Sequence, residues 1–180
     1  MRGGVASGGV MSLTVLAPGP LTTVQDEGRP GQAALGIGRS GAADRASARL
    51  ANRLVGNPLD AAVLEVTLGG LAVRADADLL VVTTGARCPG APHDAPALLR
   101  AGQELRLGTP AAGLRTYLAV RGGIDVPPVL GSRSTDVLAG LGPAVVAPGD
   151  VLPVGSPTEP FPGVDLAPVC LLYTSPSPRD

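Results

Sequence analysis

Residues 131–135 are the segment of this chain best suited to bind an oxyanion. They read Gly131-Ser132-Arg133-Ser134-Thr135, which joins a flexible backbone, three hydroxyls and a guanidinium. Consecutive backbone N–H groups and an Arg fork can converge on one negative charge. A structural interpretation is also open, in which Ser134 or Thr135 caps a short helix at 136–139. The local chemistry alone favours the cap.

A second polar cluster lies at 25–29, where an expected strand ends. Gln25, Asp26, Glu27 and Arg29 place an amide, two carboxylates and a guanidinium within five residues. Such a group can orient a polar substrate. It also fits an ordinary turn with a local ion pair, which contributes little at a surface. These residues alone leave both interpretations open.

Other polar residues stand out because their neighbours are apolar. Glu65 lies within the apolar run 63–66, so its carboxylate needs a partner, and Arg115 with Tyr117 nearby is the plausible one. Asn52 follows an apolar helical turn and is suited to tying down a loop.

The start and end of the expected helix carry polar residues with two interpretations. Ser40 and Asp44 flank its start, where they suit N-capping or, alternatively, an anion held at the helix N-terminus. Gly56 or Asn57, followed by Pro58, is expected to end the helix, and Asn57 is interpreted as a C-cap residue.

Two conspicuous patterns are expected to carry no site. Residues 36–41 spell G-x-G-x-x-G, but no long buried strand precedes them and no alternating strand and helix units follow. His93 is the single histidine and lacks the partners of a zinc site or a catalytic triad, so we interpret it as a solvated loop residue.

Composition excludes several kinds of chemistry. The 180 residues contain no lysine, so all 14 basic residues are Arg, and neither a P-loop lysine nor a Schiff-base lysine is available. The net charge of −1 gives no basic field for nucleic acid or anionic membranes. Two cysteines are too few for a disulfide framework, which favours a cytoplasmic location.

The elements that must position these residues are mostly short strands separated by Gly and Pro turns. The pattern predicts one helix at 44–54 and a β-rich, barrel-like α+β domain. A final short strand is expected within 141–163. The other expected strands are 13–17, 21–24, 62–67, 71–74, 79–84, 103–107 and 116–120.

The chain divides into four expected parts. Residues 1–11 are a disordered extension, 12–155 form the domain, and 156–169 are a linker. Residues 170–180 resemble a translated sequencing adapter and are excluded from the fold.

Six blocks, in order, resemble the allophanate hydrolase subunit 2 family, also called the 5-oxoprolinase C subunit or the biotin-dependent carboxyltransferase domain (subdomains A and B). The chain departs from the family pattern at Gly38-Arg39 and at Arg87. The blocks are Leu21–Asp26 with Gly28-Arg29, Ser40–Ala42 with Asp44, Ala51–Asn57, Leu64–Thr67 with Gly69-Gly70, Thr84–Ala86, and Tyr117–Val126 with Leu130–Thr135.

The resemblance implies a cyclophilin-like, barrel-rich fold in two halves, of which this chain is the N-terminal one. It implies one component of an ATP-dependent 5-oxoprolinase that opens 5-oxo-L-proline to L-glutamate. The partners would be the B subunit of 5-oxoprolinase, which resembles allophanate hydrolase subunit 1, and the A subunit, which is of the lactam-utilisation type. Alternatives are a carboxyltransferase component of a biotin-dependent urea or amide carboxylase, with biotin on another domain, and a non-catalytic regulatory binding subunit.

Opening an unstrained lactam requires stabilisation of charge on the carbonyl oxygen, which needs convergent donors. Because the resemblance makes this chain one half of a subunit that acts with partners, we expect the 180-residue chain alone to be inactive and to carry only part of the site. In the complex, ATP would be bound mainly by a partner. The expected catalytic residues are Asp26, Arg29, Glu65, Arg115 and Arg133. The expected substrate-binding residues are Gln25, Ser40, Asp44, Asn52, Tyr117, Gly131, Ser132, Ser134 and Thr135.

Overall fold

The computed structural model describes residues 11–161, 163 and 166–167. The expected adapter-derived segment at 170–180 and residues 1–10 of the expected extension lie outside the described residues. The division into a domain and a linker therefore stays a prediction. Among the described residues, no helix is both long enough and apolar enough to cross a membrane.

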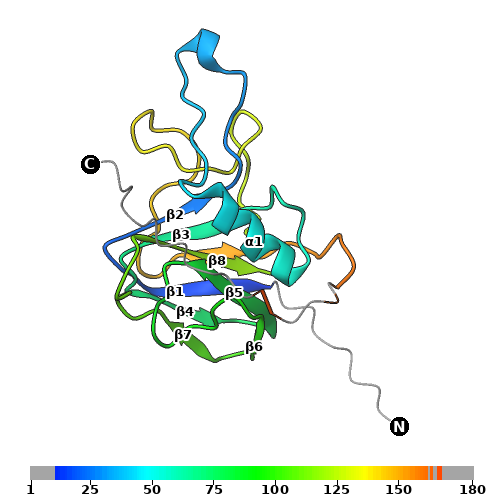
Figure 1. Cartoon of the computed structure of the whole chain (residues 1–180). Helices are drawn as coiled ribbons and strands as arrows, with labels where there is room; N and C mark the ends of the chain where they lie inside the picture. Colours follow the sequence, from blue (N-terminus) through cyan, green and yellow to red (C-terminus); the bar gives the residue numbers. More distant parts are fainter. Residues whose placement is uncertain (1–10, 162, 164–165, 168–180) are drawn as a thin grey trace, which may run out of the picture.

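Two antiparallel sheets and one α-helix form the body of the described part of the chain (Figure 1). The four-stranded sheet has the order β7 (Glu104–Arg106), β4 (Leu71–Ala75), β1 (Ser12–Pro18) and β9 (Val151–Pro153). The five-stranded sheet has the order β2 (Leu21–Gln25), β3 (Val63–Thr67), β8 (Arg115–Val120), β5 (Leu79–Gly85) and β6 (Ala97–Leu99). Helix α1 spans Arg45–Val55, and a short 3-10 helix, η1, spans Ala33–Leu35.

The main core lies between the two sheets, because alternate residues of each strand point to the same face. Leu13 and Val15 of β1 belong to one cluster with Leu64 and Val66 of β3 and Leu118 of β8. The core is aliphatic, as the near absence of aromatic residues requires.

The outer face of the five-stranded sheet is covered by α1. The residues that alternate with the main core, Val63 and Tyr117 among them, pack against Ala51, Leu54 and Val55 of the helix. The five-stranded sheet is therefore a middle layer, and its helix-facing side also holds Glu65.

The predicted β-rich α+β class is confirmed, as are the helix and the seven strands predicted before residue 121, with shifts of at most one residue at their ends. The short strand β6 was not predicted. The described strands form two separate sheets, and the cyclophilin-like barrel stays a prediction.

Two local predictions are wrong. No helix forms at 136–139, because the Asp136 side chain accepts hydrogen bonds from Leu138 N and Ala139 N and closes a turn instead. Of the two residues expected to end α1, the left-handed C-cap is Gly56, at φ 67°, and the capping role given to Asn57 is wrong.

Candidate functional site

The loop 131–135 wraps around the carboxylate of Asp26, which follows directly after β2. Asp26 Oδ1 accepts hydrogen bonds from Ser132 Oγ at 2.6 Å, Ser134 Oγ at 2.5 Å and Gly28 N at 2.8 Å. Asp26 Oδ2 accepts one from Arg133 N at 2.6 Å. The loop therefore binds an oxyanion, and in this structure the oxyanion is a side chain of the same protein.

Three further N–H groups of the loop also have partners within the chain. Ser132 N donates to Val129 O, Ser134 N to Ser132 Oγ, and Thr135 N to Val24 O. Ser134 and Thr135 therefore cap no helix, and their bonds fix the loop to the end of β2. A role for this backbone in substrate binding stays a prediction.

Arg29 lies beneath the same loop, with only 1% of its surface exposed. Its Nε donates to Val129 O at 3.0 Å and its Nη2 to Ser134 O at 2.5 Å. The expected ion pair within 25–29 does not form, because Glu27 pairs with Arg49 of α1 at 2.7 Å and Arg29 has no carboxylate within 4.0 Å among the described residues. Gln25 is also buried, and its Nε2 donates to Thr135 O at 3.0 Å.

Glu65 has the partners that the sequence predicts. Its Oε1 lies 3.4 Å from Arg115 Nε, and its Oε2 accepts hydrogen bonds from Tyr117 Oη at 2.9 Å and Ala43 N at 2.8 Å. Arg115 also donates to Thr67 Oγ1. The Tyr117 hydroxyl in turn accepts from Asp44 N at 2.7 Å. Burial raises the pKa of Tyr117, and the nearby Glu65 carboxylate adds to this shift.

Ser40 and Asp44 are placed by the loop that precedes α1. Asp44 is the N-cap residue, and its side chain accepts from Ser47 N at 3.0 Å, as the structural interpretation predicts. Ser40 Oγ donates to Asp136 Oδ2 at 2.6 Å, and this bond is the largest cause of the lowered pKa of Asp136.

Asn52 ties down the loop after α1, as expected, by donating to Ala61 O at 2.8 Å. It lies away from Asp26 and its loop, near the cavity described next. Of the predicted site residues, Gln25, Asp26, Arg29, Ser132, Arg133, Ser134 and Thr135 are joined in one network. Glu65, Arg115, Tyr117 and Asp44 form a second.

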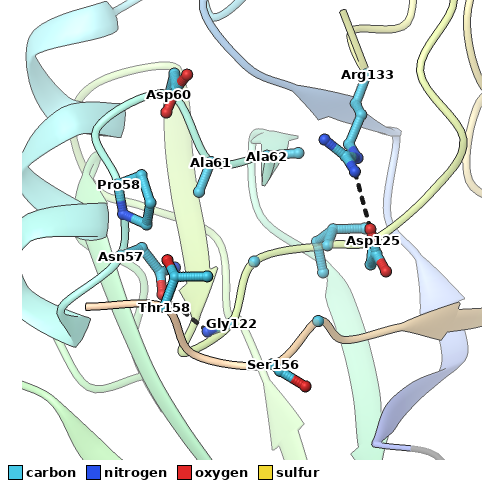
Figure 2. A pocket seen from close by; sticks show the side chains of 13 residues that line it. Asn57, Pro58, Asp60, Ala61, Ala62, Gly122, Asp125, Arg133, Ser156 and Thr158 are labelled. Atoms are coloured by element: carbon cyan, nitrogen blue, oxygen red, sulfur yellow. Dashed lines mark hydrogen bonds and ion pairs between the residues drawn. The ribbon is translucent and has the colours of Figure 1, made fainter. Parts of the chain in front are cut away.

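Arg133 reaches a cavity of about 320 Å³ (Figure 2). Its Nε donates to Val126 O at 2.7 Å and its Nη2 to Asp125 Oδ1 at 2.9 Å, so within the described chain Nη1 remains available. Asp60, Asp125, Ser156 and Thr158 also line this cavity. The sequence analysis missed these four, because each is an isolated polar residue in a loop. The sequence signal near them is the turn residues at 122–123 and 155–157, which line or adjoin the cavity in the structure.

A second cavity, of about 340 Å³, lies next to the loop, because Thr135 belongs to its lining. Segments 135–137 and 140–145 form its walls, and Thr135 and Asp136 are the polar side chains among them. Its remaining lining is largely apolar and includes Val137, Leu141, Pro143 and Val145.

The interpretation of His93 as a solvated loop residue is wrong. Only 14% of its side chain is exposed, and its Nε2 lies 3.2 Å from Asp94 Oδ2. Burial lowers the pKa of His93 and raises that of Asp94. Within the described part of the chain, no three His, Cys, Asp or Glu residues are grouped as a metal site would need.

Comparison with known families and proteins places these features in context. Residues 35–178 match the family model "Carboxyltransferase domain, subdomain A and B". The chain is 45% identical over 152 residues to the C subunit of 5-oxoprolinase from Escherichia coli strain K12, a match that covers 79% of this chain and 49% of that protein. It is 40% identical over 153 residues to the urea amidolyase of Lachancea kluyveri, covering 79% of this chain and 8% of the relative.

Solved structures give the same picture of the fold. A crystal structure of TTHA0988 superposes with a TM-score of 0.82 at 37% identity, over 91% of this chain and 34% of that one. The Kluyveromyces lactis urea amidolyase gives a TM-score of 0.81 at 34% identity, over 92% of this chain and 11% of that one. The chain thus spans about half the length of the 5-oxoprolinase component it matches, and a small part of the urea amidolyases.

Proposed function

The chain belongs to the family of the carboxyltransferase domain, subdomain A and B, and from this membership we propose that it is part of the C subunit of a 5-oxoprolinase. The complete protein, together with its partner A and B subunits, opens 5-oxo-L-proline to L-glutamate with hydrolysis of ATP. The observation that carries this proposal is the 45% identity to the C subunit of the Escherichia coli 5-oxoprolinase.

The geometry supports a role in binding negative charge. Ring opening places charge on the lactam oxygen or on a phosphate attached to it, and stabilising that charge requires fixed donors in a partly dry site. Arg133 meets this need, because it lines the cavity of about 320 Å³, and two of its donors are bonded while Nη1 has no partner among the described residues. With no lysine in the chain, a guanidinium is the side chain available for this work.

Asp26 contributes to this site through the loop rather than by touching the substrate. Its bonds to Ser132, Arg133 and Ser134 hold the backbone from which the Arg133 side chain extends. The ATP would be bound mainly by one of the partners, and we place the complex in the cytoplasm.

A second candidate function is carboxyl transfer from carboxybiotin to urea or a similar amide, with biotin carried by another domain. It is favoured by the 40% identity to a urea amidolyase over the same share of this chain. In that protein the matched region is 8% of the sequence, so the chemistry would depend on domains outside this chain. A non-catalytic regulatory role has no specific observation in its favour.

The test is reconstitution of the full-length protein with its A and B partners. We expect ATP hydrolysis that depends on 5-oxo-L-proline, with L-glutamate as product, and no turnover by the 180-residue chain alone. Replacing Arg133→Ala should reduce kcat/KM about 100-fold, a loss typical of one removed charge-stabilising donor. Arg100→Ala, at an exposed ion pair with Asp78, is the control and should leave the rate unchanged.

A well-folded complex that makes no glutamate would overturn the proposal. Urea-dependent carboxylation by the same protein would establish the second candidate instead.

A further inference from the structure

One wall of the Arg133 cavity is formed by a surface segment. Gly155, Ser156 and Thr158 line this cavity of about 320 Å³ together with Arg133. In the view of Figure 2, the stretch that carries Ser156 and Thr158 runs on the opposite side from Arg133. Every residue from 156 to 161 is exposed. We call 156–161 the wall segment, and its position therefore depends on specific contacts rather than on burial in a core.

Arg121 makes the hydrogen bond that holds the wall segment. Its Nη2 donates to Glu159 O at 2.8 Å, and its guanidinium lies over the ring of Phe161, with Cζ 5.1 Å from the ring centre. Among the described residues, the flanking backbone bonds start only at Gly155 N before the segment and at Ala167 N after it. The stretch between these two bonds is thus held to the domain at Arg121.

The guanidinium of Arg121 is itself fixed to the end of α1. Its Nη1 donates to Val55 O at 2.8 Å and to Gly56 O at 3.2 Å. The last carbonyls of a helix lack partners within the helix, and the helix dipole favours a cation beside them. Arg121 also follows β8 directly. The sheet and the helix therefore both orient this side chain toward the wall segment.

Two prolines make the wall segment stiff. Pro157 and Pro160 each restrict φ to about −65° and have no N–H group with which to bond the domain. A stiff segment moves as one piece when its single bond is released. Because Thr158 precedes Glu159 directly, the position of Glu159 sets the position of the cavity wall.

We propose that Arg121 is a positioning residue for the Arg133 cavity. It holds the wall segment against the end of α1 and thereby keeps Ser156 and Thr158 at the cavity. Arg121 does not line the cavity, so it acts through Glu159 and Phe161 and not by touching a ligand. The inference rests on the proposed function only in taking this cavity as the place where substrate binds.

The first measurement is the position of the wall segment in the full-length protein. Spin labels are attached at Glu159→Cys, which keeps the backbone carbonyl, and at Arg74→Cys on the exposed side of β4, and pulsed EPR gives the distance between them. We expect one narrow distance peak with Arg121 in place and the loss of that peak in Arg121→Ala. Arg53→Ala, in the last turn of α1, is the matched control and should keep the peak.

A second pair of variants leaves Arg121 and its bonds to α1 intact. Phe161→Leu removes the aromatic face beneath the guanidinium, whereas Phe161→Tyr keeps it. We expect a broad distance distribution for the Leu variant and a narrow one for the Tyr variant. An apolar contact alone would tolerate Leu better than Tyr, so the order of the two variants identifies the contact between guanidinium and ring.

The second measurement is turnover by the reconstituted complex. Arg121→Ala should raise KM for 5-oxo-L-proline about tenfold, which corresponds to one lost hydrogen bond, and leave kcat unchanged. A wall that positions the substrate contacts the ground state and the transition state alike. Arg133→Ala should differ by lowering kcat, because its donor stabilises charge that develops in the transition state.

Three results would overturn the inference: an unchanged distance peak in Arg121→Ala, equal distributions for the two Phe161 variants, or a released wall segment with an unchanged KM. The distances are measured without ATP, partners or turnover. A wild-type complex that makes no glutamate therefore counts against the proposed function alone, and the distances still decide whether Arg121 holds the wall segment.

Discussion

Asp26 occupies the anion-binding loop of its own protein, and this explains the unusual residue types at 131–135. The two serine hydroxyls and two backbone N–H groups that surround its carboxylate are the donors that an external oxyanion would need. At the scale of single residues, the chemistry of the loop thus serves partly to hold the structure, and Arg133 is the group that it presents to the cavity.

Replacing Asp26→Asn should destabilise the protein by about 2–4 kcal/mol, because the Asn amide nitrogen cannot accept the bonds made at one of the two carboxylate oxygens. Urea unfolding measures this change. Asp125→Asn, at an exposed pair with Arg133, is the matched control and should cost less than about 1 kcal/mol. Equal losses in the two variants would contradict this account of Asp26.

Tyr117 should make stability depend on alkaline pH. Burial raises the pKa of this phenol above its ordinary value of about 10. The folded state therefore holds the proton more tightly, and this contribution is complete below about pH 10 and is lost as the pH rises further. Tyr117→Phe should cost about 1–2 kcal/mol near neutral pH and flatten the alkaline decline. Unfolding curves of both proteins from neutral to alkaline pH give the difference, and parallel declines would refute the prediction.

Between elements, Asn57 joins the end of α1 to the end of β8. Its Nδ2 donates to Asn52 Oδ1 at 3.1 Å and to Val120 O at 2.8 Å, while its Oδ1 accepts from Gly122 N at 2.8 Å. One amide thereby fixes how the helix layer sits on the middle sheet, although helix capping was the role that the sequence suggested.

Asn57→Asp should test this connection. The carboxylate has the same shape but cannot donate, so it faces two acceptors, and we expect a loss of about 3 kcal/mol at neutral pH. Facing acceptors raises the pKa of the new carboxyl in the folded state, so part of the loss should be recovered as the pH falls and the carboxyl is protonated. The measurement is the unfolding free energy of the variant relative to wild type, at neutral pH and at acidic pH. Asp60→Asn, in the adjacent exposed loop, should show no such pH dependence.

Across the whole molecule, the ends of the two sheets meet where Gly122 follows β8 and Gly155 follows β9. A Cβ at Gly122 would lie 1.9 Å from Gly155 O, and Gly122 has a φ of +102°. Gly122→Ala should therefore cost at least about 3 kcal/mol. Gly131→Ala has a positive φ with open space around it, so it should cost only about 1 kcal/mol. Thermal unfolding of both variants separates the backbone clash from the backbone strain.

The sequence is most informative where a residue conflicts with its neighbours. Glu65 in an apolar strand demands a partner, and that demand correctly points to Arg115 and Tyr117. The strands and α1 could also be predicted from local sequence, because short apolar runs lie between Gly and Pro turns and Asp44 caps the helix. The cavity around Arg133 could not be predicted, because Asp60, Asp125 and Ser156 come from three loops whose meeting depends on the packing of the sheets. That the Asp26 carboxylate is bound by the loop 131–135 could not be predicted either, because more than 100 residues separate Asp26 from this loop in the sequence.

The pairing of β1 with β9 also sets an order of events during synthesis. Strand β1 spans Ser12–Pro18, whereas the strand that covers its edge, β9, spans Val151–Pro153. The ribosome must therefore deliver every residue up to Val151–Pro153 before that edge is closed, and until then β1 has unpaired backbone groups that can pair with other nascent chains. A chain that ends before residue 151 should therefore keep this edge of β1 open, and we expect it to aggregate more readily than a chain that includes residues 151–153.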